Sequence, residues 1–95
     1  MALVLVDAEN VRRSLWPNLS GDELVERAGI WAEREGHEVR VVFEGKRSAD
    51  EQIAAVAAAH DGPLWVVTSD RELRRRVERY AEQVIGGGGF VRLIR

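Results

Sequence analysis

The sequence contains no cysteine among its 95 residues. This absence excludes a disulfide framework, a cysteine-based zinc site and thiol chemistry. No apolar run approaches the roughly 20 residues that a membrane helix needs, so a membrane protein is not expected. The opening MALVLVDAEN has a short apolar run but no basic leader, and it predicts a first strand rather than a signal peptide. We therefore expect a cytoplasmic protein.

The sequence also lacks a basic excess, because its formal net charge is −2. A simple DNA-binding protein, whose affinity comes from neutralising phosphates, would have the opposite balance. The total hides an asymmetry. Residues 1–70 hold 7 Arg or Lys and 13 Asp or Glu, a net of −6, whereas residues 71–95 hold 7 Arg and 3 Glu, a net of +4. This distribution suits an acidic pocket beside a separate basic surface.

The phosphate-binding loops of nucleotide-binding proteins are missing too. Neither G-x-x-x-x-G-K-[ST] nor G-x-G-x-x-G follows a predicted strand. The stretch Gly86–Gly89 precedes no strong helix pattern, so we predict a flexible turn there, with a close approach to a ligand backbone as the less favoured alternative. A Ser-His-Asp site is not expected either, because His37 and His60 belong to the edge of the predicted sheet that lies away from the acids.

Three short Val-rich runs and a weaker fourth alternate with helical patterns. Nearly continuous apolar runs of this length are typical of parallel strands that helices bury on both faces. The alternation implies right-handed crossovers and a parallel sheet. We predict one α/β domain over residues 1–95, a small three-layer fold of about four parallel strands in the order 2-1-3-4, with helices on both faces. The predicted strands are 2–6, 38–43, 64–68 and 82–85, and the predicted helices are 20–35, 49–59 and 70–80, followed by a short tail.

Three S-x-x-E patterns mark the starts of the predicted helices, with serines at Ser20, Ser48 and Ser69. Each is a capping box, in which the serine side chain caps the helix and the glutamate reaches back. The helices therefore have well-defined first turns directly after the strand ends.

Acidic side chains follow each of the first three strands. Asp7 follows the first, Glu44 and then Asp50 follow the second, and Asp70 follows the third. Because ligands of open parallel sheets bind beyond the carboxyl ends of the strands, we expect these acids to gather at one edge. Clustered like charges are costly unless something compensates them. Mg²⁺ or Mn²⁺ would do so, since both prefer oxygen ligands.

Two of these acids have a second interpretation. Asp50 and Asp70 fall in the first turns of predicted helices, where acids favour the helix dipole without any other purpose. Asp22 occupies the same place as Asp50 in its own capping box and has no assigned function. Asp7 differs, because it ends a buried strand and has no capping box. Asn10 either holds the turn after the first strand or positions a ligand or water.

Basic residues lie close in sequence to the acids and are predicted to ring the same edge. They either grip phosphates of a substrate or balance nearby acids as solvated charges. The candidate substrate-binding residues are Arg12, Arg13, Lys46, Arg47, Ser69 and Arg71. The arginines further along the last predicted helix form a stripe, which usually faces solvent, and we expect them to matter less. Trp16, in the loop after the first strand, either packs on helix 20–35, which we favour, or stacks a base.

Several segments together resemble a known family. LVLVDAENVRRS resembles the opening of NYN domains, in which the Asp that ends the first strand is followed three residues later by Asn. VVFEG followed by SADEQI resembles the YacP-like branch, and VVTSDREL is similar to the third signature of that branch and of the wider PIN-like fold. VIGGGGF is similar to the Gly-rich segment of short bacterial members. The resemblance covers nearly the whole chain.

This resemblance implies a PIN-like fold with a metal-dependent, ribonuclease-type active site. The acids that would bind metal are Asp7, Asp50 and Asp70, with Asn10 beside them in the catalytic set. PIN-like nucleases usually have a fourth acid from an additional helix, and this chain shows no obvious one. Glu9 and Glu51 are the candidate substitutes.

The sequence therefore predicts a Mg²⁺- or Mn²⁺-dependent endoribonuclease that hydrolyses RNA phosphodiester bonds. One alternative is a non-catalytic RNA-binding NYN module, which the missing fourth acid favours. Another is a receiver-like domain, which also clusters acids at strand ends, although the expected strand lysine is absent. Finally, the exposed edge strands 38–43 and 82–85 leave room for a partner-binding subunit or a homodimer.

Overall fold

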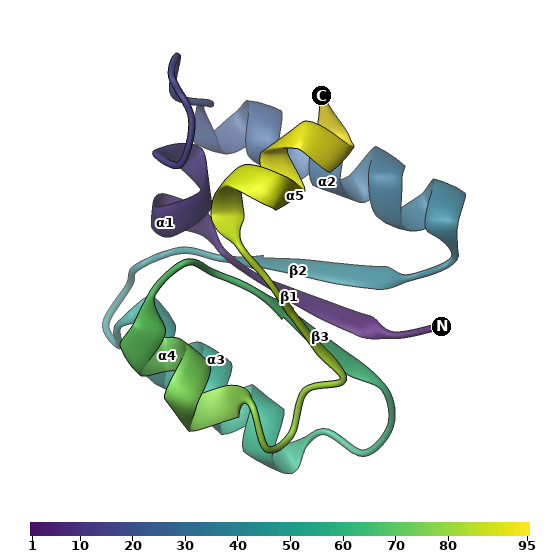
Figure 1. The fold of residues 1–95 in the computed structure, drawn as a ribbon, viewed down its shortest axis with the longest axis vertical. Coiled ribbons are helices and arrows are strands. Elements are labelled where there is room, and N and C mark those ends of the chain that lie inside the picture. Colours follow the sequence, from purple (N-terminus) through teal and green to yellow (C-terminus); the bar gives the residue numbers. More distant parts are fainter.

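A four-stranded parallel sheet lies at the centre of the computed structural model, which describes all 95 residues (Figure 1). The strand order is β2-β1-β3-β4, which confirms the predicted order. The strands are β1 (Leu3–Asp7), β2 (Glu38–Val42), β3 (Leu64–Val67) and β4 (Gln83–Ile85). Because Leu3 is in register with both Glu38 and Leu64, the first three strands finish side by side at their carboxyl ends.

Helices cover both faces of the sheet, so the predicted three-layer arrangement is confirmed. The helices are α1 (Ala8–Arg12), α2 (Gly21–Glu35), α3 (Ala49–Ala59), α4 (Arg71–Val77) and α5 (Gly87–Ile94). In Figure 1, α1, α2 and α5 lie above the sheet, and α3 and α4 lie below it. None of these helices has the length and apolar character needed to cross a membrane.

The side chains of β1 divide the hydrophobic core into two parts. Val4 and Val6 pack with α1, α2 and α5, whereas Leu3 and Leu5 pack with α3 and α4. Successive side chains of a strand point to opposite faces, and here both faces are covered. Every residue of β1 is therefore buried, which accounts for its continuous apolar sequence.

Two of the three predicted capping serines begin their helices as expected, but the glutamates predicted to reach back to them pair with Arg27 and Arg47 instead. The hydroxyl oxygens of Ser20 and Ser48 each accept a hydrogen bond of 3.1 Å from the backbone amide three residues further on. The prediction for Ser69 is wrong, because the N-cap of α4 is Asp70. The carboxylate of Asp70 accepts hydrogen bonds from two backbone amides of α4, which leaves the Ser69 side chain free for other contacts.

The predicted flexible turn at Gly86–Gly89 is wrong, because residues 87–94 form the helix α5. Its apolar side chains, Phe90, Val91 and Ile94, are buried in the core with α1 and α2. Phe90 is fully buried and meets the ring of Trp31 edge-on, with the ring centroids 5.1 Å apart. Burial of these three side chains outweighs the poor helix propensity of glycine, about 1 kcal/mol per residue relative to alanine.

The helix α1 was not predicted, and it follows β1 with no intervening loop. Ala8 and Val11 bury one side of this helix in the core. Beyond it, Leu15 packs against the same core, whereas Trp16 is 86% exposed. The predicted packing of Trp16 on the next helix is therefore wrong, and only the base-stacking interpretation stays open.

Candidate acidic active site

A cleft with a volume of about 610 Å³ lies at the carboxyl ends of β1, β2 and β3. No hydrophobic residue lines this acidic cleft, and five of the lining residues are acids. They are Asp7, Glu9, Glu44, Asp50 and Asp70. The three acids that the sequence placed at this edge therefore do meet in one cleft, as the parallel topology requires.

Asp7 is the most buried of these acids, with 5% of its surface exposed. Its Oδ2 accepts a hydrogen bond of 2.9 Å from the hydroxyl of Thr68, which directly follows β3. The same Thr68 oxygen accepts a hydrogen bond of 3.1 Å from the backbone amide of Asp70. One buried hydroxyl thus connects the end of β1 with the start of α4, and it holds Asp7 and Asp70 in a single network.

Three of the acids use only one carboxylate oxygen for such internal contacts. In addition to Oδ2 of Asp7, Oδ1 of Asp70 caps α4 by accepting from two backbone amides at 2.8 and 3.3 Å. Oε2 of Glu44 accepts from the amide of Ala49, at 3.2 Å, where α3 begins. The second oxygen of each accepts no hydrogen bond, and neither oxygen of Asp50 accepts one. The carboxylates are thus held in place and still have oxygens available for a ligand.

Burial and mutual repulsion perturb two of these groups. Burial is the main cause that raises the pKa of Asp7 above its usual 3.8; the Thr68 hydrogen bond opposes the shift, and the charges of Asp50, Asp70 and Glu44 add to it. The pKa of Asp50 is also raised, again first by burial and then by the charges of Asp70 and Glu44. The acids therefore repel one another across the cleft, and a bound cation relieves repulsion of this kind.

Glu44 joins Asp7, Asp50 and Asp70 as the fourth acid of the candidate site, in place of the predicted Glu9 or Glu51. It follows β2, not an additional helix, and the signal for it was its place directly after a predicted strand. The two suggested substitutes are engaged with arginines. Glu9 lines the cleft but pairs with Arg12 at 2.7 Å, and Glu51 pairs with an arginine at 3.7 Å and does not line the cleft.

Asn10 lines the cleft and also ties three segments together. Its Oδ1 accepts a hydrogen bond of 2.8 Å from the amide of Ser69, and the hydroxyl oxygen of Ser69 accepts another of 2.8 Å from the amide of Gly87. A Cβ atom at Gly87 would collide with the hydroxyl oxygen of Ser14, so the close approach of α5 to α1 requires glycine there. Asn10 therefore does hold the turn after β1, and its side chain is at the same time part of the cleft wall.

The two basic residues at the C-terminal end of α1, Arg12 and Arg13, have different surroundings. Arg12 is committed within the fold, because its guanidinium donates to the Glu9 carboxylate and, at 2.9 Å, to the carbonyl of Leu19. Arg13 lines the cleft with its side chain 70% exposed, and one of its nitrogens lies 3.9 Å from Glu9. A single glutamate therefore offsets much of the positive charge that the sequence placed here.

The other predicted basic residues lie outside the acidic cleft. Lys46 and Arg47 line a neighbouring hollow of about 360 Å³ together with Phe43 and Gln52. Arg71 is exposed at the first position of α4, immediately after Asp70. Of the histidines, His37 accepts a hydrogen bond from the amide of Ala2 at the opposite end of the sheet, as the sequence indicated.

The donor chemistry of the cleft suits a hard divalent cation. The acids provide carboxylate oxygens, which Mg²⁺ and Mn²⁺ prefer, and there is no thiolate or imidazole among them. In this structure, however, no three acidic or histidine side chains converge closely enough to form a ready-made metal group. The residues fit such a cation by chemical type, and closing around it would require their side chains to move inward.

Fold and cleft together define a small PIN-like α/β domain with carboxylates at the carboxyl edge of a parallel sheet. The chain is similar to the crystal structure of Rae1 (YacP) from Bacillus subtilis, solved as the W164L mutant, with a TM-score of 0.83 and 21% sequence identity. The match covers 99% of this chain and 75% of the other chain. The YacP-like NYN fold that the sequence motifs indicated is therefore confirmed. No family model and no curated protein sequence matches the chain.

Proposed function

We propose that this chain is a Mg²⁺- or Mn²⁺-dependent endoribonuclease. The observation that carries the proposal is the acidic cleft, in which four carboxylates from the ends of three strands repel one another. Three of the four, Asp7, Asp50 and Asp70, stand at the positions that resemble the metal-binding acids of the YacP-like NYN family. The confirmed fold supports the same activity, because it provides the arrangement in which that family's site is built.

Asp7, Asp50 and Asp70 would hold the cation, and Glu44 would complete the set. When bound, the cation supplies an activated water and stabilises the leaving oxygen of the phosphodiester. Thr68 occupies one oxygen of Asp7 and the amides of α4 occupy one oxygen of Asp70, which would leave the other oxygen of each for the cation. Asn10 and Ser69 fix the wall of the cleft against which the substrate phosphate would lie.

A non-catalytic RNA-binding module is the second candidate. The observation that favours it is the lack of three acidic side chains already converged on one point. In that case the fold and the surrounding cations would hold RNA, and the cleft would bind a cation loosely or not at all. The two candidates differ in one respect only, which is whether bound RNA is cut.

The decisive experiment is incubation of a mixed-structure RNA with and without Mn²⁺. We expect cleavage that needs the metal and that disappears in Asp7→Asn, Asp50→Asn and Asp70→Asn, each with an unchanged fold. Asp61→Asn is the matched control, because Asp61 is exposed and lies outside the cleft. Cleavage that persists in EDTA or in Asp70→Asn would overturn the mechanism, and RNA that is bound but never cut would establish the binding module.

A further inference from the structure

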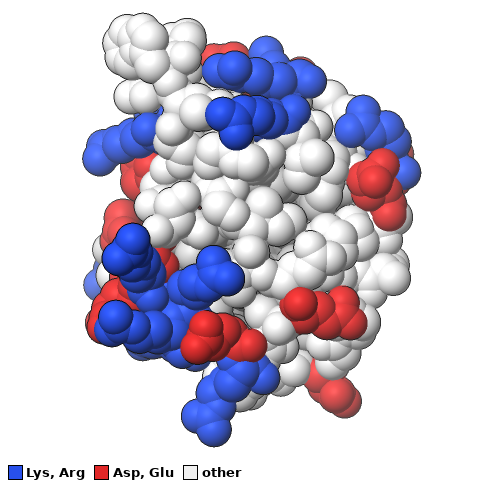
Figure 2. All heavy atoms as spheres, viewed as in Figure 1, with Lys and Arg blue, Asp and Glu red and all other residues white.

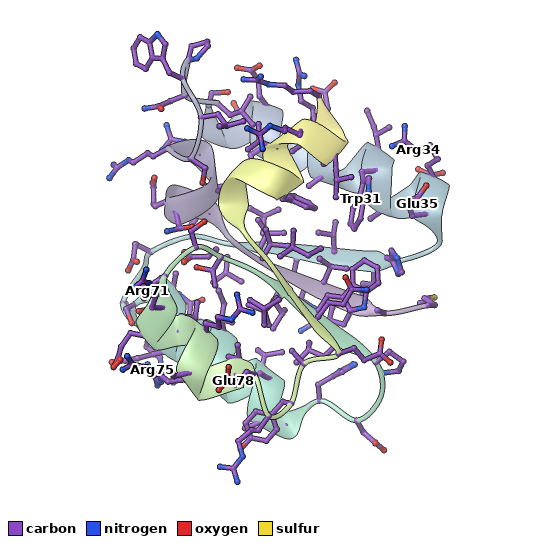
Figure 3. The ribbon with its side chains drawn as sticks, viewed as in Figure 1. Trp31, Arg34, Glu35, Arg71, Arg75 and Glu78 are labelled. Carbon is purple, nitrogen blue, oxygen red and sulfur yellow. The ribbon has the colours of Figure 1, made fainter.

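The helix α4 carries the densest group of positive charge in the molecule. Residues 71–79 include five arginines and two glutamates. All five arginines are exposed. Four of them, Arg71, Arg74 and Arg75 in α4 and Arg79 just beyond its end, are here called the α4 arginine row. Figure 2 shows basic side chains gathered over α4, and Figure 3 shows Arg71 and Arg75 on the outer side of this helix.

Most of the α4 arginine row is not neutralised within the protein. Arg75 pairs with Glu72 at 3.3 Å, but no carboxylate lies within 4 Å of the nitrogens of the other three. Arg79 instead lies over the ring of Tyr80, 5.5 Å from its centroid. By contrast, Arg12 and Arg13 at the end of α1, which the sequence favoured for binding phosphates, both pair with Glu9. The largest group of unpaired positive charge beside the cleft therefore lies on α4, and Lys46 in the neighbouring hollow adds a single unpaired charge.

The row also starts at the cleft itself. Asp70 is both an acid of the cleft and the N-cap of α4, and Arg71 is the next residue. The helix then leads away from the acids at about 1.5 Å per residue, with its arginines on the solvent side and Leu73 and Val77 buried. A polyanion that reaches the cleft can continue along this helix without a break.

The cleft alone would repel such a polyanion, because its acids outnumber its single basic residue, Arg13. Binding energy must then come from unpaired cations at its border. We propose that the α4 arginine row binds the phosphates of the RNA strand on one side of the cleavage site. This inference rests on the proposed function and adds to it the side of the cleft along which the strand runs.

The test is the salt dependence of binding to a fluorescently labelled single-stranded RNA of mixed sequence, measured in EDTA so that metal-dependent cleavage does not consume the RNA. The variant Arg71→Gln/Arg74→Gln/Arg79→Gln removes the three unpaired arginines of the α4 arginine row. If each contacts one phosphate, the slope of log affinity against log salt should fall by about two units. Affinity should weaken to a similar extent for RNAs of different sequence.

The matched control is Arg27→Gln/Arg34→Gln/Arg40→Gln, which changes the net charge by the same amount. These three arginines all pair with glutamates, and Arg34 lies at the far end of α2 from α4 (Figure 3). We expect this variant to keep the slope of the unmodified protein. A triple Arg→Lys variant at the same three positions of the α4 arginine row should keep it too, because the charge is retained, and circular dichroism of the Gln variant checks that its fold is unchanged.

Three outcomes would overturn the inference. Equal losses in the α4 variant and in the control would mean that only net charge matters. An α4 variant that binds like the unmodified protein, while that protein still cuts RNA with Mn²⁺, would remove the inference and leave the proposed function standing. No RNA binding by the unmodified protein in EDTA at any salt concentration would remove the inference, and cleavage with Mn²⁺ would then decide the proposed function separately. If the α4 variant loses RNA affinity but the unmodified protein never cuts RNA, the α4 arginine row still binds RNA and the binding module is favoured.

Discussion

The hydroxyl of Thr68 donates a hydrogen bond of 2.9 Å to the carboxylate of Asp7, although the two residues are 61 positions apart in the chain. The bond crosses from the end of β3 to the end of β1, the two central strands of the sheet. It favours the charged form of Asp7, in opposition to the burial that disfavours it. Thr68 is therefore the residue whose hydrogen bond eases the ionisation of Asp7 against the effect of its burial.

Replacement of Thr68 by valine should raise the pKa of Asp7 further, because it removes the one hydrogen bond that lowers it. Since a cation binds the ionised carboxylate, metal binding should then begin at a higher pH than in the unmodified protein. Carboxyl NMR titration of Asp7 measures this directly. Thr68→Ser keeps the hydroxyl and should keep the original titration; an Asp7 that titrates identically in the valine variant would contradict the assignment.

The metal-free Asp7→Asn variant should be more stable than the unmodified protein at neutral pH. The pKa of Asp7 is raised in the folded state, so folding disfavours its ionisation, and stability is lost as the pH rises from 3.8 through the folded-state pKa. Asparagine avoids this loss and can still accept the Thr68 hydrogen bond. Melting temperatures at pH 7 and below pH 3.8 test the sign, because the advantage should vanish where Asp7 is protonated. Asp61→Asn, outside the cleft, should show no such pattern, and destabilisation of Asp7→Asn at pH 7 would make Asp7 a structural residue.

Millimolar Mn²⁺ should raise the melting temperature of the unmodified protein. A ligand that binds only the folded state stabilises it by mass action, by about 1.4 kcal/mol at ten times its dissociation constant. The increase should shrink in Asp7→Asn, Asp50→Asn and Glu44→Gln, each of which removes one charge from the cleft. Sodium chloride at the same ionic strength is the control, and an equal increase with it would show that screening, not binding, is responsible.

Two substitutions at Asp70 should separate its role as the N-cap of α4 from its role in the cleft. Asparagine is as good an N-cap as aspartate, so Asp70→Asn should keep the stability of the protein while losing metal-dependent cleavage. Asp70→Ala removes the cap of α4 and should cost about 1 kcal/mol in addition. Urea denaturation of both variants gives the comparison. Equal stabilities would mean that the hydrogen bonds to the two amides of α4 contribute nothing.

Gly87 should tolerate no side chain, because a Cβ atom there meets the hydroxyl oxygen of Ser14. We expect Gly87→Ala to destabilise the protein and to separate α5 from α1. The second change Ser14→Ala should restore part of the lost stability, since it removes the colliding oxygen. Gly29→Ala is the control in the helix α2, where nothing lies within 4 Å of the added atom, and it should stabilise by about 0.5–1 kcal/mol. Thermal unfolding of these three variants and of the unmodified protein tests this order.

The parts of the fold that follow from local patterns were predictable from the sequence. The Val-rich runs gave the strands, and strand–helix alternation gave their parallel order. The carboxyl-edge rule brought Asp7, Asp50 and Asp70 to one cleft without any knowledge of side-chain contacts. Glu44 obeys the same rule, because it follows β2 closely in the chain, whereas the family resemblance implies a fourth acid on an additional helix.

The parts that depend on long-range contacts were not predictable. The four glycines before Phe90 indicate a turn by propensity, and only the burial of that ring against Trp31 makes the segment helical. Ser69 has the spacing of a capping serine, yet its hydroxyl is used by Gly87, which is 18 positions away. The loss of free charge from Arg12 and Arg13 also depends on their actual distances to Glu9, which no sequence pattern gives.

The attachment of α5 to Ser69 through Gly87 gives the molecule a fixed order of assembly as it is synthesised. All five acids of the cleft have been incorporated once residue 70 is made, but Phe90, which fills the core above β1, comes much later. A chain still emerging from the ribosome therefore carries the acids without the helix that fixes the wall beside them. We expect the wall beside the cleft to become rigid only after the residues of α5 have been made and Phe90 has packed into the core.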